Sequence, residues 1–348
     1  MREVDIAVVG ATGAVGQVFL KLLEERRFPA RSVRLMASAR SAGKRINVNG
    51  QELVVEETTP DSFQGVGVAF ISVSSAVSRK LVPAARAAGA VVIDDSSAFR
   101  MDPEVALVVP EVNGDDLEDG TGVIAIPNCS TTPLVMVLHA LRQLSPIRRV
   151  IADTYQSVSG TGGAAMVELR EQTRRVLDGG QANPEVYPKQ IAFNVIPHIE
   201  GFLDNGYTRE EWKLLEETRK ILHDPEIAIS GTCVRVPAFV SHSEAVHIEF
   251  ESPVGVGEAR EALRGFPGVS VLDDPENNGY PTPWEAEGTD DVYVGRIRKD
   301  ASHPNGLAMW IVSDNLRKGA ALNAMQIAEE LLRRDLVPPL EAKRAIKR

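Results

Sequence analysis

The N-terminal end of the chain limits most strongly what it can fold into. The short apolar segment Asp5–Val9 runs directly into Gly10-Ala11-Thr12-Gly13-Ala14-Val15-Gly16, and a helical apolar pattern follows. A buried strand, a glycine turn and a helix in this order begin a βαβ unit, in which the backbone of the turn can approach a pyrophosphate. The spacing is G-x-x-G-x-x-G rather than the commoner G-x-G-x-x-G, so the prediction of a dinucleotide site depends on the position of the turn between a strand and a helix. We therefore expect a dinucleotide site around Gly10, Gly13 and Gly16.

The alternation of strands and helices continues to about residue 128. Further short apolar runs have the length of buried strands, and helix-like segments such as Leu81–Ala88 lie between them: Val33–Met36, Val68–Val73, Val91–Ile93 and Val123–Ile126. Such alternation is typical of a parallel sheet that helices cover on both faces. The fold class is therefore α/β, with a doubly wound Rossmann-type domain over residues 1–128.

The pattern changes over residues 129–313. Longer segments with partial alternation predict strands at Arg149–Gln156, Cys233–Val236, Ala245–Phe250, Val292–Ile297 and Leu307–Val312. Helical patterns interrupt them at Gly163–Leu177 and Thr208–Leu222. This predicts an α+β domain with a mixed or antiparallel sheet. We expect the last helix, roughly Leu316–Leu332 within residues 314–335, to return to the first domain and complete it.

Composition sets further limits. A length of 348 residues favours two domains, because single cores stop growing at about 250–300 residues. The formal net charge of −10 argues against binding to nucleic acid or to an anionic membrane. The two cysteines form no disulfide framework, and no apolar run approaches the ~20 residues that span a bilayer. The first residues, Met1–Asp5, show no signal-peptide pattern, so we expect a cytoplasmic protein.

The end of the second predicted strand indicates which nicotinamide cofactor is bound. NAD sites usually place Asp or Glu there for the ribose 2′-hydroxyl. This strand ends instead in Met36-Ala37-Ser38-Ala39-Arg40-Ser41, with Lys44 nearby. Ser38, Arg40 and Ser41 suit a 2′-phosphate, and the alternative is a solvated basic loop. We predict NADP.

One of the two cysteines lies where a helix is predicted to begin. In the segment Pro127-Asn128-Cys129-Ser130-Thr131-Thr132, followed by Pro133, the proline fits the first helical position and the hydroxyl residues can cap it. A thiol at a helix N-terminus is favoured as the thiolate, the nucleophilic form. The alternative is a small buried core cysteine, but such a residue does not need amide and hydroxyl neighbours. The pattern therefore favours a reactive Cys129.

A second group of candidates follows the strand at Cys233–Val236. Arg235 is flanked there by valines, where a charge is unfavourable unless it is paired or faces a cleft, so it binds a carboxylate or forms a structural ion pair. His242, after a short loop, is a candidate proton acceptor, although a loop histidine is usually just exposed. Arg100 follows the strand ending at Ile93 and could meet an anion at the crevice, or be a surface arginine. Cys233 reads as structural, and no spacing resembles a metal site.

Taken together, these motifs resemble the aspartate-semialdehyde dehydrogenase family over nearly the whole chain. The match rests on the glycine loop and on six further segments: Ser96–Arg100, Pro127–Thr132, Tyr155–Gly160, Glu210–Lys220, Arg235–Glu244 and Ser313–Ala321. The combination of Asn-Cys-Ser-Thr-Thr with His-Ser-Glu is the most specific part. The chain departs from many members at Ser74-Ser75, where they carry Gly-Gly next to the cofactor.

The resemblance implies a role for each candidate. It makes Cys129 the nucleophile, His242 the general acid and base, and Gln156 an orienting residue. Arg235 would hold the substrate α-carboxylate and Glu210 the amino group, while Arg100, Asn128 and Lys213 would bind phosphate. Glu210 and Lys213 are three apart on a helix, so a surface ion pair is the alternative. Cofactor contacts would come from Gly10, Thr12, Gly13, Ala14, Val15, Ser38, Arg40, Ser41, Ser159, Gly160 and Asn315.

The implied activity is NADP-dependent reductive dephosphorylation of L-aspartyl-4-phosphate to L-aspartate-4-semialdehyde through a thioester on Cys129. This reaction belongs to lysine, threonine and methionine biosynthesis. Two other enzymatic readings are reductases of N-acetylglutamyl phosphate and of a longer acyl phosphate, and a reading of another class is a non-catalytic NADP-sensing module. The resemblance also implies a homodimer or a dimer of dimers, without indicating its interface.

Overall fold

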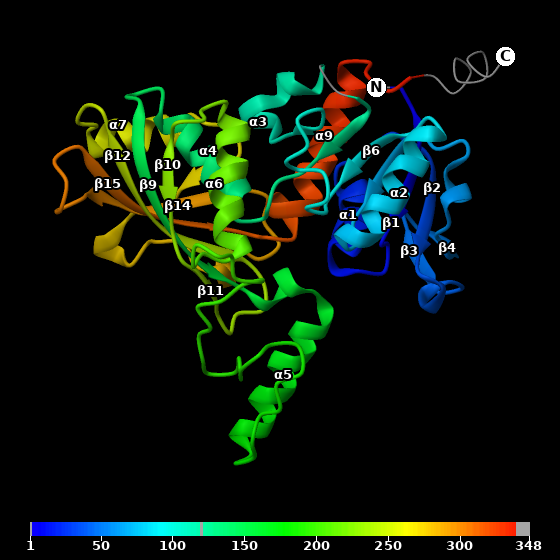
Figure 1. Cartoon of the computed structure of the whole chain (residues 1–348), viewed down its shortest axis with the longest axis horizontal. Helices are drawn as coiled ribbons and strands as arrows, with labels where there is room; N and C mark the ends of the chain where they lie inside the picture. Colours follow the sequence, from blue (N-terminus) through cyan, green and yellow to red (C-terminus); the bar gives the residue numbers. More distant parts are fainter. Residues whose placement is uncertain (1, 119–120, 339–348) are drawn as a thin grey trace. The chain divides into compact units, whose positions relative to one another are not determined.

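The structure is a computed structural model that describes residues 2–118 and 121–338. The chain forms two compact units (Figure 1). The first contains the segment up to Pro127 and the segment from Ala320 onward, and the second contains Asn128–Gly319. The first unit is thus built from two parts of the chain that are far apart in the sequence.

The first unit is a largely parallel sheet with strand order β3-β4-β2-β1-β5-β6-β8-β7. Its strands are β1 Val4–Val9, β2 Ala30–Ala37, β3 Arg45–Val48, β4 Gln51–Glu57, β5 Val68–Ile71, β6 Val91–Asp94, β7 Ala106–Leu107 and β8 Val123–Ala125. Its helices are α1 Ala14–Glu25, α2 Ser75–Ala87, α3 Pro110–Asn113 and α9 Leu322–Arg333. The predicted α/β class is confirmed. From β1 the sheet extends through β2 and β4 in one direction and through β5, β6 and β8 in the other, as in a doubly wound sheet.

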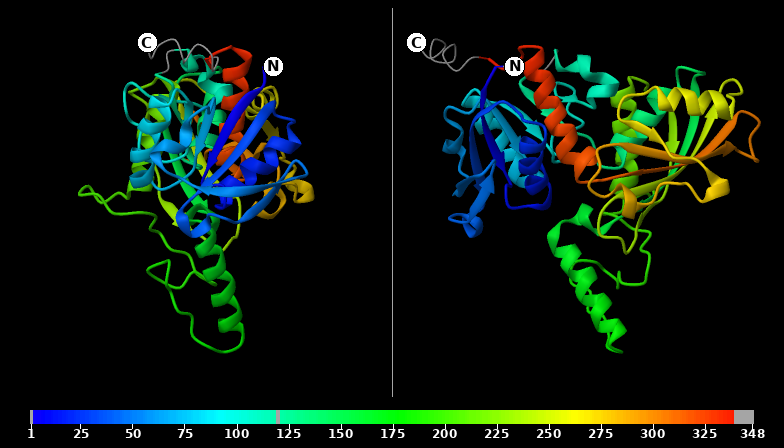
Figure 2. Two further views of the ribbon diagram at one scale, coloured as in Figure 1. Left: turned by 90° about the vertical axis from the view of Figure 1, so that its right-hand side faces the viewer. Right: turned by 180° about the vertical axis from the view of Figure 1, so that it is seen from behind.

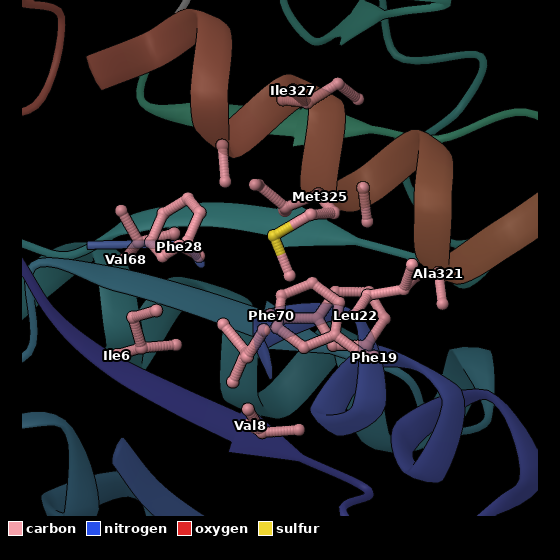
Figure 3. Packing of buried hydrophobic residues seen from close by; sticks show 14 of the residues in the cluster. Ile6, Val8, Phe19, Leu22, Phe28, Val68, Phe70, Ala321, Met325 and Ile327 are labelled. Carbon is pink, nitrogen blue, oxygen red and sulfur yellow. The ribbon is translucent and has the colours of Figure 1, made fainter. Parts of the chain in front are cut away.

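Apolar side chains between the sheet and two helices form the core of the first unit. Phe19 of α1 stacks on Phe70 of β5 with ring centroids 4.2 Å apart, and Met325 of α9 belongs to the same cluster (Figure 3). On β1, Ile6 and Val8 point into it, as expected for alternate residues of one strand. The C-terminal helix therefore buries its apolar face in the core of the first unit.

Two features of the first unit differ from the sequence-based expectation. The antiparallel pair β3–β4 was not predicted, because its residues are mostly polar and exposed and lack a clear apolar run. The last helix was predicted as one continuous pattern from Leu316, but Arg317–Ala321 forms a π-helical turn and α9 begins only at Leu322. Widened turns of this kind are often found at functional sites.

The second unit is a mixed sheet with strand order β10-β9-β12-β15-β14-β13, and β11 also pairs with β9. Its strands are β9 Ile147–Gln156, β10 Ala228–Ser230, β11 Cys233–Arg235, β12 His242–Phe250, β13 Val269–Val271, β14 Val292–Lys299 and β15 Gly306–Ser313. The central strands β9, β12 and β15 run antiparallel, whereas β10 and β11 pair parallel with β9. The predicted mixed sheet is confirmed.

Helices α4 Thr131–Leu141, α6 Arg209–Leu222 and α7 Val256–Arg264 pack together beside this sheet, and the short helix α8 Pro283–Ala286 contacts β15. Helix α5, Gly163–Leu177, instead leaves the sheet as an arm that both views show clearly (Figure 2). In β12, Val246, Ile248 and Phe250 are buried, whereas His247 and Glu249 are half-buried, as the alternation predicted. One face of the sheet is therefore the packed face.

Candidate active site

Three predicted site residues stand in one row across the second sheet. In the strand register Gln156 of β9 lies beside Arg235 of β11 on one side and His242 of β12 on the other. Residues opposite one another on paired strands project from the same face, so the three side chains are neighbours. All three are buried. His242 was expected in a loop, but it is the first residue of β12, because pairing with β9 continues to that position.

Cys129 lies two residues before α4 and is half-buried. The prediction that Pro133 begins this helix was wrong: α4 begins at Thr131, and no side chain caps its N-terminus. A proline is tolerated throughout the first turn, since the N–H it lacks has no partner within the helix there. The π-helical turn passes close to the thiol residue, since a Cβ at Gly319 would lie 2.9 Å from the Cβ of Cys129.

The carboxylate of Glu210 connects the neighbour of Cys129 to the row on the sheet. Its Oε1 accepts hydrogen bonds from Asn128 Nδ2 and Gln156 Nε2, both at 2.9 Å, and Lys213 Nζ donates to Oε2 at 3.1 Å. Burial alone raises the pKa of Glu210, but the Lys213 ammonium and these hydrogen bonds outweigh it and lower the pKa to about 2. Glu210 and Lys213 do form the ion pair that was the alternative reading, although Glu210 is buried rather than on the surface.

His242 has two very different ring nitrogens. Nδ1 accepts a hydrogen bond from the backbone N–H of Ser157 at 3.1 Å and lies 3.0 Å from the Ser157 hydroxyl oxygen. Nε2 is buried and makes no hydrogen bond in the described part of the chain. It approaches the backbone at Gly160, where a Cβ would lie 3.1 Å from it. Burial and then the charge of Arg235 lower the pKa of His242 to about 3, so the ring is neutral.

Asn315 ties the segments around His242 together. Its Oδ1 accepts from the backbone N–H of Ser241 at 2.9 Å and from the hydroxyls of Ser159 at 3.0 Å and Ser157 at 3.2 Å. Ser241 itself has φ of +69°, an uncommon backbone conformation for a residue with a side chain. Ser157 lies between the predicted site residues Gln156 and Ser159 but was not singled out from the sequence, because a single serine between them carries no distinguishing pattern.

Arg235 is a buried cation at the end of β11. Its Nη1 donates to the Ser157 carbonyl at 2.7 Å. Within residues 2–118 and 121–338, no carboxylate forms an ion pair with it, and its Nε makes no hydrogen bond. The alternative of a structural ion pair therefore does not describe this arginine. A buried guanidinium in this condition is suited to an anionic ligand.

The glycine turn of the first unit is shaped for a phosphate group. Gly10 has φ of +86°, and a Cβ there would lie 2.1 Å from the carbonyl oxygen of Ser72. A Cβ at Gly16 would lie 2.3 Å from the Gly10 carbonyl, so α1 can approach the turn only without a side chain. Gly13 precedes α1, and no side chain caps this helix N-terminus. The turn thus fits a dinucleotide pyrophosphate. Of the other predicted contacts, Thr12 lies in the turn, and Ala14 and Val15 are the first two residues of α1.

The residues expected around the 2′-phosphate lie just after β2. Ser38 and Arg40 are exposed, and Thr12 Oγ1 donates to Ser41 Oγ at 3.3 Å. Arg100 also belongs to the first unit, and it is buried rather than a surface arginine, with Nη2 donating to the Asp95 carbonyl at 2.9 Å. Asn128 and Lys213 belong to the second unit, where both bind Glu210.

Other observations concern the remaining predictions. Cys233 is fully buried in β11, and burial raises the pKa of its thiol far above the usual range. No helix of the described ranges is long and apolar enough to cross a membrane. In the same ranges, no group of three or more His, Cys, Asp or Glu side chains could hold a metal ion.

Comparisons with known proteins place the chain in a family. Residues 5–120 match the model of the semialdehyde dehydrogenase NAD binding domain, and residues 138–318 match that of the semialdehyde dehydrogenase dimerisation domain. The aspartate-semialdehyde dehydrogenase of Aquifex aeolicus is 49% identical over 336 residues, covering 95% of this chain and 99% of that protein. The chain belongs to the aspartate-semialdehyde dehydrogenase family.

Solved structures of aspartate-semialdehyde dehydrogenases agree with this membership. The Vibrio cholerae enzyme II, crystallised in complex with ASA, is 43% identical, covers 96% of this chain and 99% of its own, and has a TM-score of 0.93. The Candida albicans enzyme with NADP is 27% identical, covers 95% and 98% of the two chains, and has a TM-score of 0.74. As a member of this family, the chain has a nicotinamide-binding first domain and a second domain of the dimerisation type.

Proposed function

We propose that this protein converts L-aspartyl-4-phosphate to L-aspartate-4-semialdehyde with NADPH, and catalyses the reverse phosphorylating oxidation. The single observation that carries the proposal is the site on the second unit. There a thiol residue beside a helix N-terminus is linked through Asn128 and Glu210 to Gln156, and Gln156 stands beside His242 and Arg235. Family membership supports this reading, which makes the protein an oxidoreductase of lysine, threonine and methionine biosynthesis.

Cys129 is the nucleophile of the proposed reaction. Its thiolate attacks the acyl carbon and displaces phosphate, which leaves a thioester on the enzyme. Gln156 would orient the reacting group, because its side chain is fixed by a hydrogen bond to Glu210 and by one from the Thr154 hydroxyl. His242 would be the general acid and base that acts on the oxygen of the adduct at Cys129. Covalent catalysis of this kind divides one difficult transfer into two easier steps.

The substrate would be recognised by charge. Arg235, a buried guanidinium whose Nε lacks a hydrogen bond, suits the α-carboxylate. Glu210 is ionised at neutral pH and suits the amino group. Arg100, Asn128 and Lys213 would bind phosphate, as the resemblance implies. These assignments rest on the resemblance and on the chemistry of each side chain.

NADP is the cofactor that the first unit fits. The glycine turn at Gly10–Gly16 would hold the pyrophosphate, and Ser38, Arg40 and Ser41 would hold the 2′-phosphate. Ser159, Gly160 and Asn315 would contact the nicotinamide end. When bound, the cofactor supplies or accepts the hydride of the reaction. The Candida albicans relative with NADP supports the choice of NADP over NAD.

The test is a phosphate-dependent assay that follows NADPH formation from aspartate semialdehyde, run in parallel with NAD and NADP. We expect turnover with NADP that needs inorganic phosphate. Cys129→Ala should abolish turnover and retain NADPH binding, whereas Cys233→Ala, at the other cysteine, should keep turnover. Phosphate-dependent turnover by Cys129→Ala would refute the nucleophile, and equal use of NAD would refute the role of Arg40. Offering N-acetylglutamyl phosphate in the reductive direction separates the other substrate.

A further inference from the structure

Helix α6 buries two carboxylates in its packed face. The buried residues of this helix include Glu210, Leu214, Glu217 and Ile221, which recur at the spacing of one helix face. Such a face is normally apolar, because a buried carboxylate is unfavourable unless it is hydrogen-bonded. Glu210 is bonded to Lys213 and to two side-chain amides, as described above. Glu217 is only 1% exposed, so it too must have a partner that stabilises a carboxylate in this position.

Both carboxylates bind the residue that precedes the cysteine at the start of α4. Glu217 Oε2 accepts a hydrogen bond from the backbone N–H of Asn128 at 2.6 Å. Glu210 Oε1 accepts one from the side-chain amide of the same residue at 2.9 Å. The two glutamates are separated by about two helical turns, so α6 holds Asn128 at its backbone and at its side chain. We call Glu210 and Glu217 the Asn128 clamp.

Asn128 passes this constraint on to the first residues of α4. Its Oδ1 accepts the backbone N–H of Ser130 at 3.0 Å. Its carbonyl accepts the N–H of Thr132 at 3.0 Å and the Thr132 hydroxyl at 3.3 Å. Asn128 therefore satisfies N–H groups at a helix N-terminus that has no side-chain cap of its own. Cys129 lies between Asn128 and Ser130, so both of its neighbours in the chain are fixed.

We propose that Glu217 is a positioning residue for the nucleophile Cys129, and that it acts by accepting the backbone N–H of Asn128. The inference rests on the proposed function and adds to it a residue that acts only through Asn128. Misplacing a reacting group by 1 Å can lower the rate about 100-fold, so the clamp matters for catalysis. The second N–H of Asn128 Nδ2 has no acceptor among the described residues, so the clamp leaves it for an anionic ligand such as phosphate.

Two substitutions separate the reach of the Glu217 side chain from its charge. Glu217→Gln keeps an acceptor oxygen at the same reach and removes the charge, whereas Glu217→Asp keeps the charge but is one methylene too short. We expect the kcat of Glu217→Gln to stay within about threefold of wild type and that of Glu217→Asp to fall at least about tenfold, with KM for NADP unchanged in both. Glu216→Gln is the matched control and should keep kcat, because Glu216 is half-buried in the same helix and does not bind Asn128.

Alkylation of Cys129 by iodoacetamide, located by peptide mass spectrometry, reports on the thiol without any substrate. A thiol displaced from the helix N-terminus loses stabilisation of its thiolate, so Glu217→Asp should react at least about threefold more slowly than wild type at pH 7, and Glu217→Gln at least as fast as wild type.

A role in stability alone would change the unfolding temperature and leave kcat and the alkylation rate of the folded variants unchanged. Alkylation of Glu217→Asp at the wild-type rate would overturn the proposal. A folded Glu217→Gln whose kcat is lowered tenfold or more would overturn it without the second variant. Failure of the proposed function shows separately, as wild-type protein whose Cys129 is alkylated but which forms no NADPH with phosphate and aspartate semialdehyde.

Discussion

At the scale of single residues, Arg235 is the clearest candidate for substrate recognition, because its buried charge has no carboxylate partner in the part of the chain that the structure describes. A charged hydrogen bond contributes about 1.5–3 kcal/mol, so Arg235→Ala should raise KM for aspartate semialdehyde roughly 10- to 100-fold. It should leave KM for NADP unchanged. Arg149→Ala is the matched control, because its guanidinium is exposed and pairs with Glu249. Steady-state kinetics measure this, and an unchanged KM in Arg235→Ala would remove it from the substrate site.

Glu210 should make stability depend on pH in the acid range. Its folded pKa of about 2 lies below the ordinary 4.5, so its ionised form favours the folded state. This contribution, on the order of 3 kcal/mol, is present above the ordinary pKa and is lost as pH falls from about 5 toward 2. Urea unfolding of wild type and Glu210→Gln should show a gap in unfolding free energy that narrows over this range. A gap that stays constant would show that the carboxylate is not stabilised by Lys213 and its neighbours.

At the scale of elements, the π-helical turn Arg317–Ala321 positions the nucleophile. Gly319 allows the turn to approach Cys129, since a Cβ there would lie 2.9 Å from the Cβ of the cysteine and 3.1 Å from its carbonyl oxygen. Gly319→Ala should displace the thiol and lower kcat at least about tenfold, because small misplacements of reacting groups are costly. At Gly257, in α7, an added Cβ would meet no atom within 4 Å, so Gly257→Ala should leave kcat unchanged. Equal kcat in both variants would show that the thiol tolerates the shift.

The helices and strands also show which parts of the fold could be predicted from the sequence. Apolar periodicity located β1, α1, β9 and α5 closely, because their burial patterns are regular. The polar pair β3–β4 has no such pattern and was missed. In the site, side-chain chemistry marked Cys129, His242 and Arg235, but Ser157 bonds to His242 and Arg235 through its backbone N–H and carbonyl, which every residue except proline possesses. Only the fold shows that these groups lie beside the ring.

At the scale of the whole molecule, the two faces of the second sheet have different tasks. Along β9, Thr154 and Gln156 project toward the site, and Tyr155 projects from the opposite face. Tyr155 is 38% exposed, and its ring lies 5.4 Å from that of Trp310 on β15. Trp310 is half-buried, and aromatic residues that stay partly exposed on a sheet face are typical of interaction surfaces. Because the second unit matches a dimerisation domain, we propose that this face binds a second copy of the chain.

Tyr155→Lys tests this interface. Burying an unpaired ammonium between two copies is unfavourable by several kcal/mol, so the variant should shift from dimer toward monomer in sedimentation velocity at micromolar concentration. Val54→Lys is the matched control, since Val54 is 50% exposed on β4 of the first unit and should leave the dimer intact. Because Tyr155 points away from Gln156, the NADPH affinity of the variant should equal that of wild type. A dimer as stable as wild type in Tyr155→Lys, or dissociation in Val54→Lys alone, would move the interface elsewhere.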